Sequence, residues 1–275
     1  MDIIKKIQLT ELLTIAKEAG DAILDVYDSD FAVERKEDKS PLTLADKRSD
    51  EIIFSALNRL YPEIPILSEE GRSIPFTERE EWEYLWLIDP LDGTKEFVKR
   101  NGEFTVNIAL IHNSEPVVGV IYIPVTQVFY FAKRGLGAYK RTYTRDMEMI
   151  GEDNELLQGS ERLPLPDALN RPFTVVGSRS HMSQETEEHI NELKKVHGDI
   201  AIISAGSSIK ICMVADGRAD LYPRFGPTME WDTAAGQAIV EGAGGALVDA
   251  ATDEPLRYNR ENLLNSSFIV KLEKG

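Results

Sequence analysis

Apolar residues recur at helical and strand spacing along the chain, and the two periods alternate. In residues 9–27 the apolar positions are three or four residues apart, which predicts an amphipathic helix, and residues 46–60 repeat the pattern. Apolar runs separated by turn residues then predict an antiparallel meander over residues 106–111, 117–123 and 128–131. This part of the chain is therefore expected to be α+β.

Short apolar runs and helical patterns alternate after residue 172, which is typical of an α/β arrangement. The polar stretch before them carries several Pro and Gly and is predicted to be a connection. We expect an N-terminal half over residues 1–142, a connecting segment over 143–172 and a C-terminal half over 173–275. The elements expected in the C-terminal half are 173–176, 184–196, 200–203, 207–215, 232–241 and 246–248.

The composition permits a large core and excludes several classes of protein. The chain has 275 residues, 42% of them hydrophobic, and a net charge of −16; general nucleic-acid binding is not expected, because it requires a basic surface. No apolar run approaches the ~20 residues that cross a bilayer, and no leader-like segment is visible. A single cysteine, Cys212, fits a reducing compartment, so a cytoplasmic location is expected.

Two carboxylates lie three residues apart where an apolar run ends. Residues 84–88 have the length of a strand, and Asp89 and Asp92 follow it with Leu91 between them. Carboxylate and carbonyl oxygens are the ligands that Mg²⁺ prefers, so these two side chains and the Leu91 carbonyl form a candidate metal site. For an isolated pair, a turn whose Asp residues only accept backbone hydrogen bonds is the ordinary alternative.

Further acids occupy comparable positions. Glu69 follows a second short apolar run, residues 64–67, and Asp232 and Asp46 each lie near the predicted start of a helix. Taken alone, Asp232 and Asp46 also fit ordinary helix caps. The acids are therefore candidates for one site only if the fold brings them together.

A tight turn and a short predicted helix follow the acidic pair. Gly93 lets the backbone approach a ligand closely, and Thr94 opens the helical pattern of residues 94–98. The free N–H groups at such a helix start suit a phosphate. A metal site and a phosphate site would then adjoin.

Several of these segments resemble the motifs of one enzyme family. They are Ser68-Glu69-Glu70, Asp89-Pro90-Leu91-Asp92-Gly93-Thr94 and Trp231-Asp232-Thr233-Ala234-Ala235-Gly236. In this order and spacing they resemble the lithium-sensitive, magnesium-dependent phosphatases related to inositol monophosphatase. The segments beginning at Lys95 and at Leu221 are similar to the 3'(2'),5'-bisphosphate nucleotidases of the CysQ type within that family. The resemblance extends from about residue 7 to about residue 267.

The resemblance implies a layered α-β-α-β-α sandwich, two or three Mg²⁺ ions and hydrolysis of a phosphate monoester by water. Thr94 and Asp46 would orient and deprotonate the water, with Glu69 assisting. The implied metal ligands are Glu69, Asp89, the Leu91 carbonyl, Asp92 and Asp232. The implied substrate-binding residues are Glu69, Leu91, Asp92, Gly93, Thr94, His181, Ser207, Lys210, Arg224 and Asp232.

The resemblance further implies a substrate. The expected reaction removes the 3'-phosphate of adenosine 3',5'-bisphosphate to give AMP, in sulfate assimilation, with the 5'-phosphosulfate analogue as a second substrate. The alternatives are a phosphatase for inositol or another sugar monophosphate, and a metal-binding protein without catalysis. The expected partner is this small molecule, with no nucleic acid and no transmembrane segment. Contact with the inner face of the membrane, and the choice between monomer and homodimer, stay open.

Overall fold

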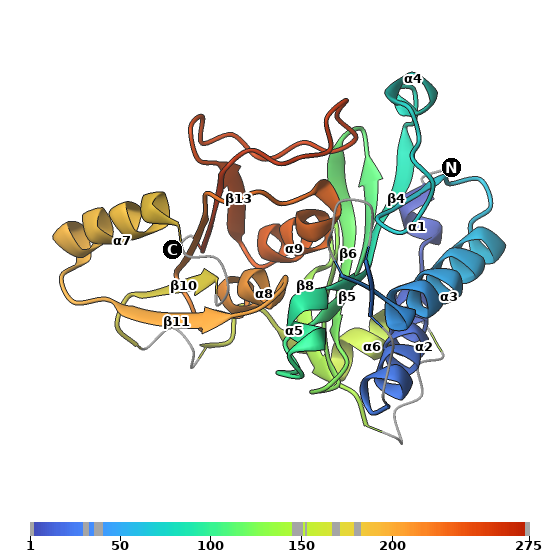
Figure 1. Cartoon of the computed structure of the whole chain (residues 1–275), viewed down its shortest axis with the longest axis horizontal. Coiled ribbons are helices and arrows are strands. Elements are labelled where there is room, and N and C mark those ends of the chain that lie inside the picture. The colour runs from blue at the N-terminus through green and yellow to red at the C-terminus, as the bar shows by residue number, and fades with distance from the viewer. Residues whose placement is uncertain are drawn as a thin grey trace.

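Helices and sheets alternate in layers through the protein (Figure 1). The computed structural model describes residues 3–29, 33–35, 41–144, 151, 153–166, 171–178 and 183–272. The helices are α1 (Ile3–Lys6), α2 (Leu9–Tyr27), α3 (Leu44–Leu60), α4 (Phe76–Arg79), α5 (Thr94–Val98), α6 (Asp153–Gln158), α7 (Gln184–His197), α8 (Ile209–Ala215) and α9 (Glu230–Gly242). The strands are β1 (Val33–Arg35), β2 (Pro41–Thr43), β3 (Ile66–Ser68), β4 (Tyr84–Asp92), β5 (Thr105–His112), β6 (Glu115–Ile123), β7 (Val128–Lys133), β8 (Gly137–Thr142), β9 (Glu161–Arg162), β10 (Thr174–Ser178), β11 (Ala201–Ala205), β12 (Leu221–Arg224), β13 (Gly245–Asp249) and β14 (Phe268–Leu272).

Helices α2 and α3 pack together on one face of a seven-stranded sheet. The apolar positions that predicted α2 are buried, among them Leu12, Ala16 and Ile23. Helices α8 and α9 lie between this sheet and a five-stranded sheet, and α7 lies beyond the second sheet (Figure 1). The predicted α-β-α-β-α sandwich is thereby confirmed.

The seven-stranded sheet has the order β3-β4-β5-β6-β7-β8-β9, and all its neighbouring strands are antiparallel except β3 and β4. The predicted meander is therefore correct. Strand β4 is longer than predicted, because Asp89 and Asp92 both pair with β5 across a shift in register. What the sequence predicted as a turn after residue 88 is a bulged strand end, which re-aims the side chains that follow it.

The five-stranded sheet has the order β11-β10-β12-β14-β13. The sequence did not predict β12 or β14. Strand β12 contains Pro223, which has no N–H for a ladder and weakens the strand signal. Strand β14 lies between β12 and β13 and is antiparallel to both, so it joins β13 to the rest of the sheet.

The segment predicted as a connection is partly regular where it is described. Strand β9 pairs with β8 and extends the first sheet. Helix α6 is attached through Asp153, whose carboxylate accepts hydrogen bonds from the Leu9 N–H at 2.7 Å and from Lys133 Nζ at 2.9 Å. No helix in the described parts of the chain has the length and apolar character needed to span a membrane.

Helix α9 packs closely on strand β6. A Cβ atom added to Gly119 would lie 2.3 Å from the Ala235 carbonyl oxygen and 2.9 Å from the Ala238 Cβ. On the opposite face of the sheet, a Cβ added to Gly20 of α2 would lie 2.4 Å from the Tyr122 ring. Glycine thus sets how closely the layers approach at this strand.

We expect Gly119→Ala to destabilise the protein by about 1 to 3 kcal/mol, because the added methyl meets the backbone of α9. Gly236→Ala is the matched comparison, since its added methyl meets only the Ile211 side chain and alanine favours a helix by about 1 kcal/mol. Urea unfolding of both variants measures the difference. A cost for Gly119→Ala no larger than that for Gly236→Ala would contradict this account of the packing.

Candidate functional site

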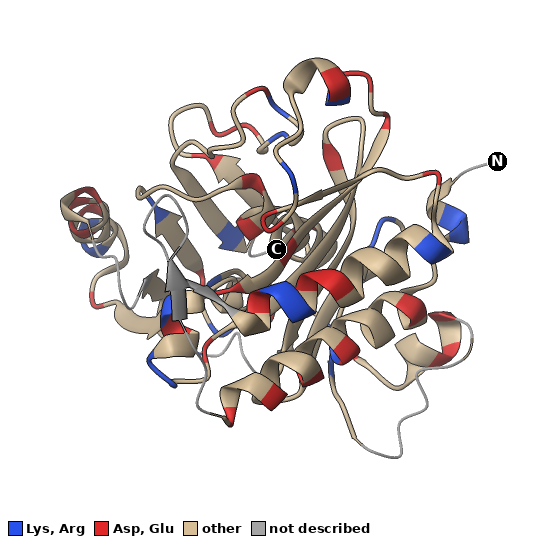
Figure 2. Cartoon of the chain, turned by 45° about the vertical axis from the view of Figure 1, so that its right-hand side comes forward, with Lys and Arg blue, Asp and Glu red and all other residues tan. Residues whose placement is uncertain are grey.

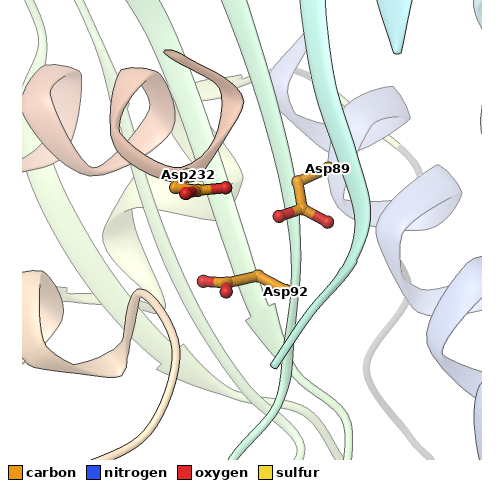
Figure 3. A group of neighbouring side chains, drawn as sticks. All are labelled: Asp89, Asp92 and Asp232. Carbon is orange, nitrogen blue, oxygen red and sulfur yellow. The ribbon is translucent and has the colours of Figure 1, made fainter. Parts of the chain in front are cut away.

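Carboxylates from both halves of the chain meet between the sheets. Asp89 and Asp92 come from the end of β4, and Asp232 comes from the first turn of α9. Each offers an oxygen atom, and these atoms lie within 4.8 Å of one another. Figure 3 shows the three side chains pointing toward a shared space. Residues about 140 positions apart in sequence therefore form one acidic cluster.

The cluster raises the pKa values of its own carboxyl groups. Burial, followed by the proximity of Glu69, Asp92, Asp232 and Asp46, holds the pKa of Asp89 well above its ordinary value. Burial and the Asp92 charge do the same to the pKa of Asp232. Burial raises the pKa of Asp92 to about 6, although Lys210 and the Ser208 N–H act in the opposite direction. Each carboxylate is therefore costly to ionise without a nearby cation.

The bulge in β4 has its own supports. The Asp89 Oδ1 atom accepts a hydrogen bond from the Leu91 N–H at 3.1 Å. The buried Ser49 of α3 donates from Oγ to the Pro90 carbonyl oxygen at 2.7 Å. Helix α3 thereby holds the strand end that bears Asp89 and Asp92.

Asp232 has a second contact at the start of α9. Its Oδ2 atom accepts a hydrogen bond from the Met229 N–H at 2.8 Å, so the interpretation as a helix cap was correct in part. The neighbouring Glu230 is fully buried and accepts hydrogen bonds from the N–H groups of Asn259 and Arg260, at 2.6 and 3.1 Å. These contacts tie the start of α9 to the chain that follows β13.

The remaining predicted metal and catalytic residues surround the cluster. Glu69 is exposed at the end of β3 and lines the cavity, and Asp46 of α3 is buried behind it. Both are close enough to raise the pKa of Asp89. Thr94 starts α5, and its hydroxyl donates to the Leu91 carbonyl oxygen over a long 3.5 Å.

A cavity of about 310 Å³ extends from the carboxylates toward two cations of the C-terminal half. Lys210 is buried, and burial lowers the pKa of its ammonium group to about 8, although Asp92 acts to raise it. Arg224 lies at the end of β12, and its Nε atom is buried without a hydrogen-bond partner among the described residues. An anion is the natural partner for these two groups.

The two halves approach closely at the cavity. Gly93 has a φ of +96°, and a Cβ added there would lie 3.1 Å from the Glu103 carbonyl oxygen and 3.3 Å from the Ser207 Cβ. Ser207 has a φ of 45°, which a residue with a side chain rarely adopts. The Glu103 carboxylate accepts a hydrogen bond from the Gly206 N–H at 2.8 Å. Backbone strain of this kind often marks a binding site.

Most of the predicted site residues lie around this one cavity. Asp46 does not line it, and His181, one of the implied substrate-binding residues, lies outside the described residues. The sequence assigned no role to Glu96 or Glu103, although both lie in a segment that carries the resemblance. The residues brought to the cavity as predicted are Glu69, Asp89, Leu91, Asp92, Gly93, Thr94, Ser207, Lys210, Arg224 and Asp232.

The negative charge of the protein is not confined to this site. Acidic residues are distributed over several helices and loops, with basic residues among them (Figure 2). Glu78, Glu80 and Glu81, for example, are exposed. The three clustered carboxylates differ from these surface acids because they share one partly enclosed space.

Known proteins are similar to this chain in sequence and in fold. The chain is 45% identical over 267 residues to the 3'(2'),5'-bisphosphate nucleotidase CysQ of Salmonella typhimurium, with 96% of this chain and 99% of that protein covered. The crystal structure of CysQ from Bacteroides thetaiotaomicron, described as a bacterial member of the inositol monophosphatase family, matches with a TM-score of 0.87 and 50% identity, over 98% of both chains. The IMPase of Thermotoga maritima shares the fold, with a TM-score of 0.71 at 23% identity, over 94% of this chain and 89% of that one.

The model of the inositol monophosphatase family matches residues 6–274. The match includes both ends of the acidic cluster and the strands that position them. This chain therefore belongs to the inositol monophosphatase family.

Proposed function

We propose that this protein is a magnesium-dependent 3'(2'),5'-bisphosphate nucleotidase that hydrolyses the 3'-phosphate of adenosine 3',5'-bisphosphate to give AMP and phosphate. The observation that carries the proposal is that one cavity is lined both by an acidic cluster and by the cations Lys210 and Arg224. The first suits a metal ion with a phosphate, and the second suits another anion of the same substrate. The 45% identity to a protein named 3'(2'),5'-bisphosphate nucleotidase supports the same substrate class.

The donor set fits Mg²⁺. Asp89, Asp92 and Asp232 supply only oxygen atoms, and their raised pKa values mark a site that lacks positive charge. We propose that these three residues, with Glu69 and the Leu91 carbonyl, hold two or three Mg²⁺ ions. Bound divalent ions would supply charge neutralisation for the phosphate and a lower pKa for water.

The other residues would handle the water and the phosphate. Thr94 and Asp46 would orient the attacking water, whose proton passes by way of the Thr94 hydroxyl toward the Asp46 carboxylate. The water oxygen forms a bond to phosphorus while the bond between phosphorus and the 3'-oxygen breaks, and the released 3'-oxygen takes up a proton from solvent water to give the 3'-hydroxyl of AMP. The N–H groups of Gly93 and Thr94 would hold the phosphate oxygens, since the left-handed Gly93 starts α5 at that point.

The C-terminal half would select the nucleotide. Lys210 and Arg224 would bind the 5'-phosphate, with Ser207 beside the sugar and His181 as the proposed adenine contact. In this division, residues 1–142 supply most metal ligands, residues 143–172 connect, and residues 173–275 supply the nucleotide contacts and Asp232. The 5'-phosphosulfate analogue would fit the same cations.

A sugar monophosphate phosphatase would use the same carboxylates. Such a substrate needs no second anion subsite, so Lys210 and Arg224 favour the bisphosphate nucleotide. A protein without catalysis would not need Glu69, Asp89, Asp92, Thr94 and Asp232 together. A cytoplasmic location, and the state of monomer or homodimer, stay predictions from the sequence.

A panel of substrates tests the proposal directly. We expect phosphate release in Mg²⁺ to be fastest with adenosine 3',5'-bisphosphate, followed by its 5'-phosphosulfate analogue, and slow with inositol 1-phosphate and fructose 1,6-bisphosphate. The measurement is kcat/KM for each compound at one pH and ionic strength. A preference for either sugar phosphate would overturn the proposed substrate.

Asp92→Asn should lower turnover roughly 100-fold or more, because it removes a charged metal ligand. It should also stabilise the metal-free protein. The pKa of Asp92 is raised to about 6, so the folded state binds the proton more tightly than the unfolded chain, and stability is lost as the pH rises from about 4 to about 6. The stabilising effect should therefore be about 1 to 2 kcal/mol at neutral pH, since solvent screens part of the charge of this half-buried group, and should shrink as the pH falls toward 4.

Urea unfolding in EDTA, at pH 5 and pH 7, measures this difference between wild type and Asp92→Asn. The same protein with saturating Mg²⁺ is the control, because the cation should reverse the order of stability. A difference that is equal at both pH values would show that the Asp92 charge is not the cause.

Lys210→Met and Arg224→Ala should each weaken binding of the bisphosphate by about 1.5 to 3 kcal/mol, the range for hydrogen bonds to charged groups. Binding of adenosine 3'-monophosphate, which lacks the 5'-phosphate, should change little. Steady-state KM and kcat on both substrates separate the effects, with the surface variant Lys271→Met as the control. An equal loss on both substrates would place these residues outside the 5'-phosphate subsite.

A further inference from the structure

A chain of buried polar side chains lies beside the acidic cluster. Thr105 and Asn107 belong to β5 and Ser208 precedes α8, and their exposed fractions are 0, 1 and 3%. The Thr105 and Ser208 hydroxyl oxygens are 2.8 Å apart, and Ser208 Oγ lies 2.8 Å from Asn107 Oδ1. Buried polar groups are costly unless each has a partner, so such a chain needs a reason.

The pairing of β4 with β5 brings these polar side chains next to the proposed metal ligands Asp89 and Asp92. In the pairing of β4 with β5, Asp92 lies opposite Thr105 and Asp89 lies opposite Asn107. The Ser208 N–H donates to Asp92 Oδ2 at 2.5 Å. Ser208 therefore contacts Asp92 through its backbone N–H, and it contacts Thr105 and Asn107 through its hydroxyl.

The number of hydrogen atoms available on these side chains determines which atom donates in each hydrogen bond. Asn107 Oδ1 can only accept, so the single hydroxyl hydrogen of Ser208 is donated to it. The Thr105 hydroxyl must then donate to Ser208 Oγ. The Asn107 amide nitrogen is left as a donor; it is buried, and it forms no well-formed hydrogen bond within the described parts of the chain.

The acceptor that this amide faces is Asp92. Ser208 joins the two residues, since its Oγ donates to Asn107 Oδ1 at 2.8 Å and its N–H donates to Asp92 Oδ2 at 2.5 Å. The reversed amide orientation would turn its oxygen toward a carboxylate, which is repulsive. Asp92 is thus held by the Ser208 N–H, and Ser208 is in turn held through its hydroxyl by Thr105 and Asn107.

We propose that Thr105, Asn107 and Ser208 form a positioning chain that holds the Asp92 carboxylate in place for a divalent cation and links it to the segment that carries Lys210. The proposal rests on the proposed function only in taking Asp92 as a ligand of the cation. None of the three side chains needs to touch the substrate. Groups that orient metal ligands in this way typically change metal affinity 10- to 100-fold when they are removed.

Variants of the same shape test the chain. Asn107→Leu removes the amide, Thr105→Val removes a hydroxyl, and Thr105→Ser keeps it. The control is Thr174→Val, because Thr174 is also a buried strand threonine, with its hydroxyl on the Pro172 carbonyl oxygen at 2.8 Å and no place in the cavity. Mg²⁺ affinity is measured by titration calorimetry on EDTA-treated protein without substrate, after circular dichroism has shown that each variant is folded.

We expect Asn107→Leu to weaken Mg²⁺ binding at least 10-fold and Thr105→Val to weaken it several-fold, while Thr105→Ser and Thr174→Val stay within about two-fold of wild type. If Asn107→Leu does not fold, the Mg²⁺ affinities of Thr105→Val and Thr105→Ser test the proposal without it. The positioning chain would be overturned if Thr105→Val bound Mg²⁺ as tightly as wild type. It would also be overturned if Thr174→Val lost as much Mg²⁺ affinity as Thr105→Val. Wild-type protein that fails to bind Mg²⁺ would overturn the metal site itself, a result that the Thr105 variants cannot imitate.

Discussion

The mutual repulsion of Asp89, Asp92 and Asp232 is the constraint on which the rest of the structure depends. Burial of these carboxylates, together with the like charges around them, costs free energy, and the raised pKa values of all three groups record that cost, to which burial contributes most. A fold can keep such a cluster only if each carboxylate has a rigid support. Here the supports are separate: the bulge in β4, the first turn of α9 and the N–H of Ser208.

Close packing of the layers makes those supports rigid. Gly119 brings β6 into contact with α9, and Gly93 brings the end of β4 next to Ser207. The strained backbone of Ser207 is kept because its neighbours leave it no alternative. The cavity is therefore a place where two well-packed halves meet, with conformational strain concentrated at the contact.

The sequence predicted the elements whose signal is local. Helix α2 and the strands of the meander appear where the apolar periods placed them, because one buried face determines each pattern. It could not show that Asp92 stays in the sheet, since a bulge depends on the partner strand. Strands β12 and β14 were missed because Pro223 and a short run give weak local signals. The sequence assigned no role to Asn107, because its contact with Ser208 beside Asp92 exists only in the folded protein.

The order of the motifs predicted most of the candidate site residues. It could not predict the buried residues that hold them in place. Motifs identified Asp89, Asp92 and Asp232 as members of one group, and the structure adds the contacts that hold them, such as Ser49 on Pro90 and Glu230 on Asn259. Those supporting residues are buried polar groups in otherwise apolar patterns. Only the three-dimensional pairing shows which of them have a partner in the site.

The position of β14 between β12 and β13 has a consequence for synthesis of the protein. Strand β12, with Arg224 at its end, can pair with β10 as soon as it is synthesised, but its second neighbour, β14, comes later in the sequence, at residues 268–272. Asp232 reaches β4 only across a long separation in sequence, a contact that forms slowly. A growing chain thus carries Asp89 and Asp92 without their third partner, and the complete acidic cluster can form only after Asp232 has been synthesised.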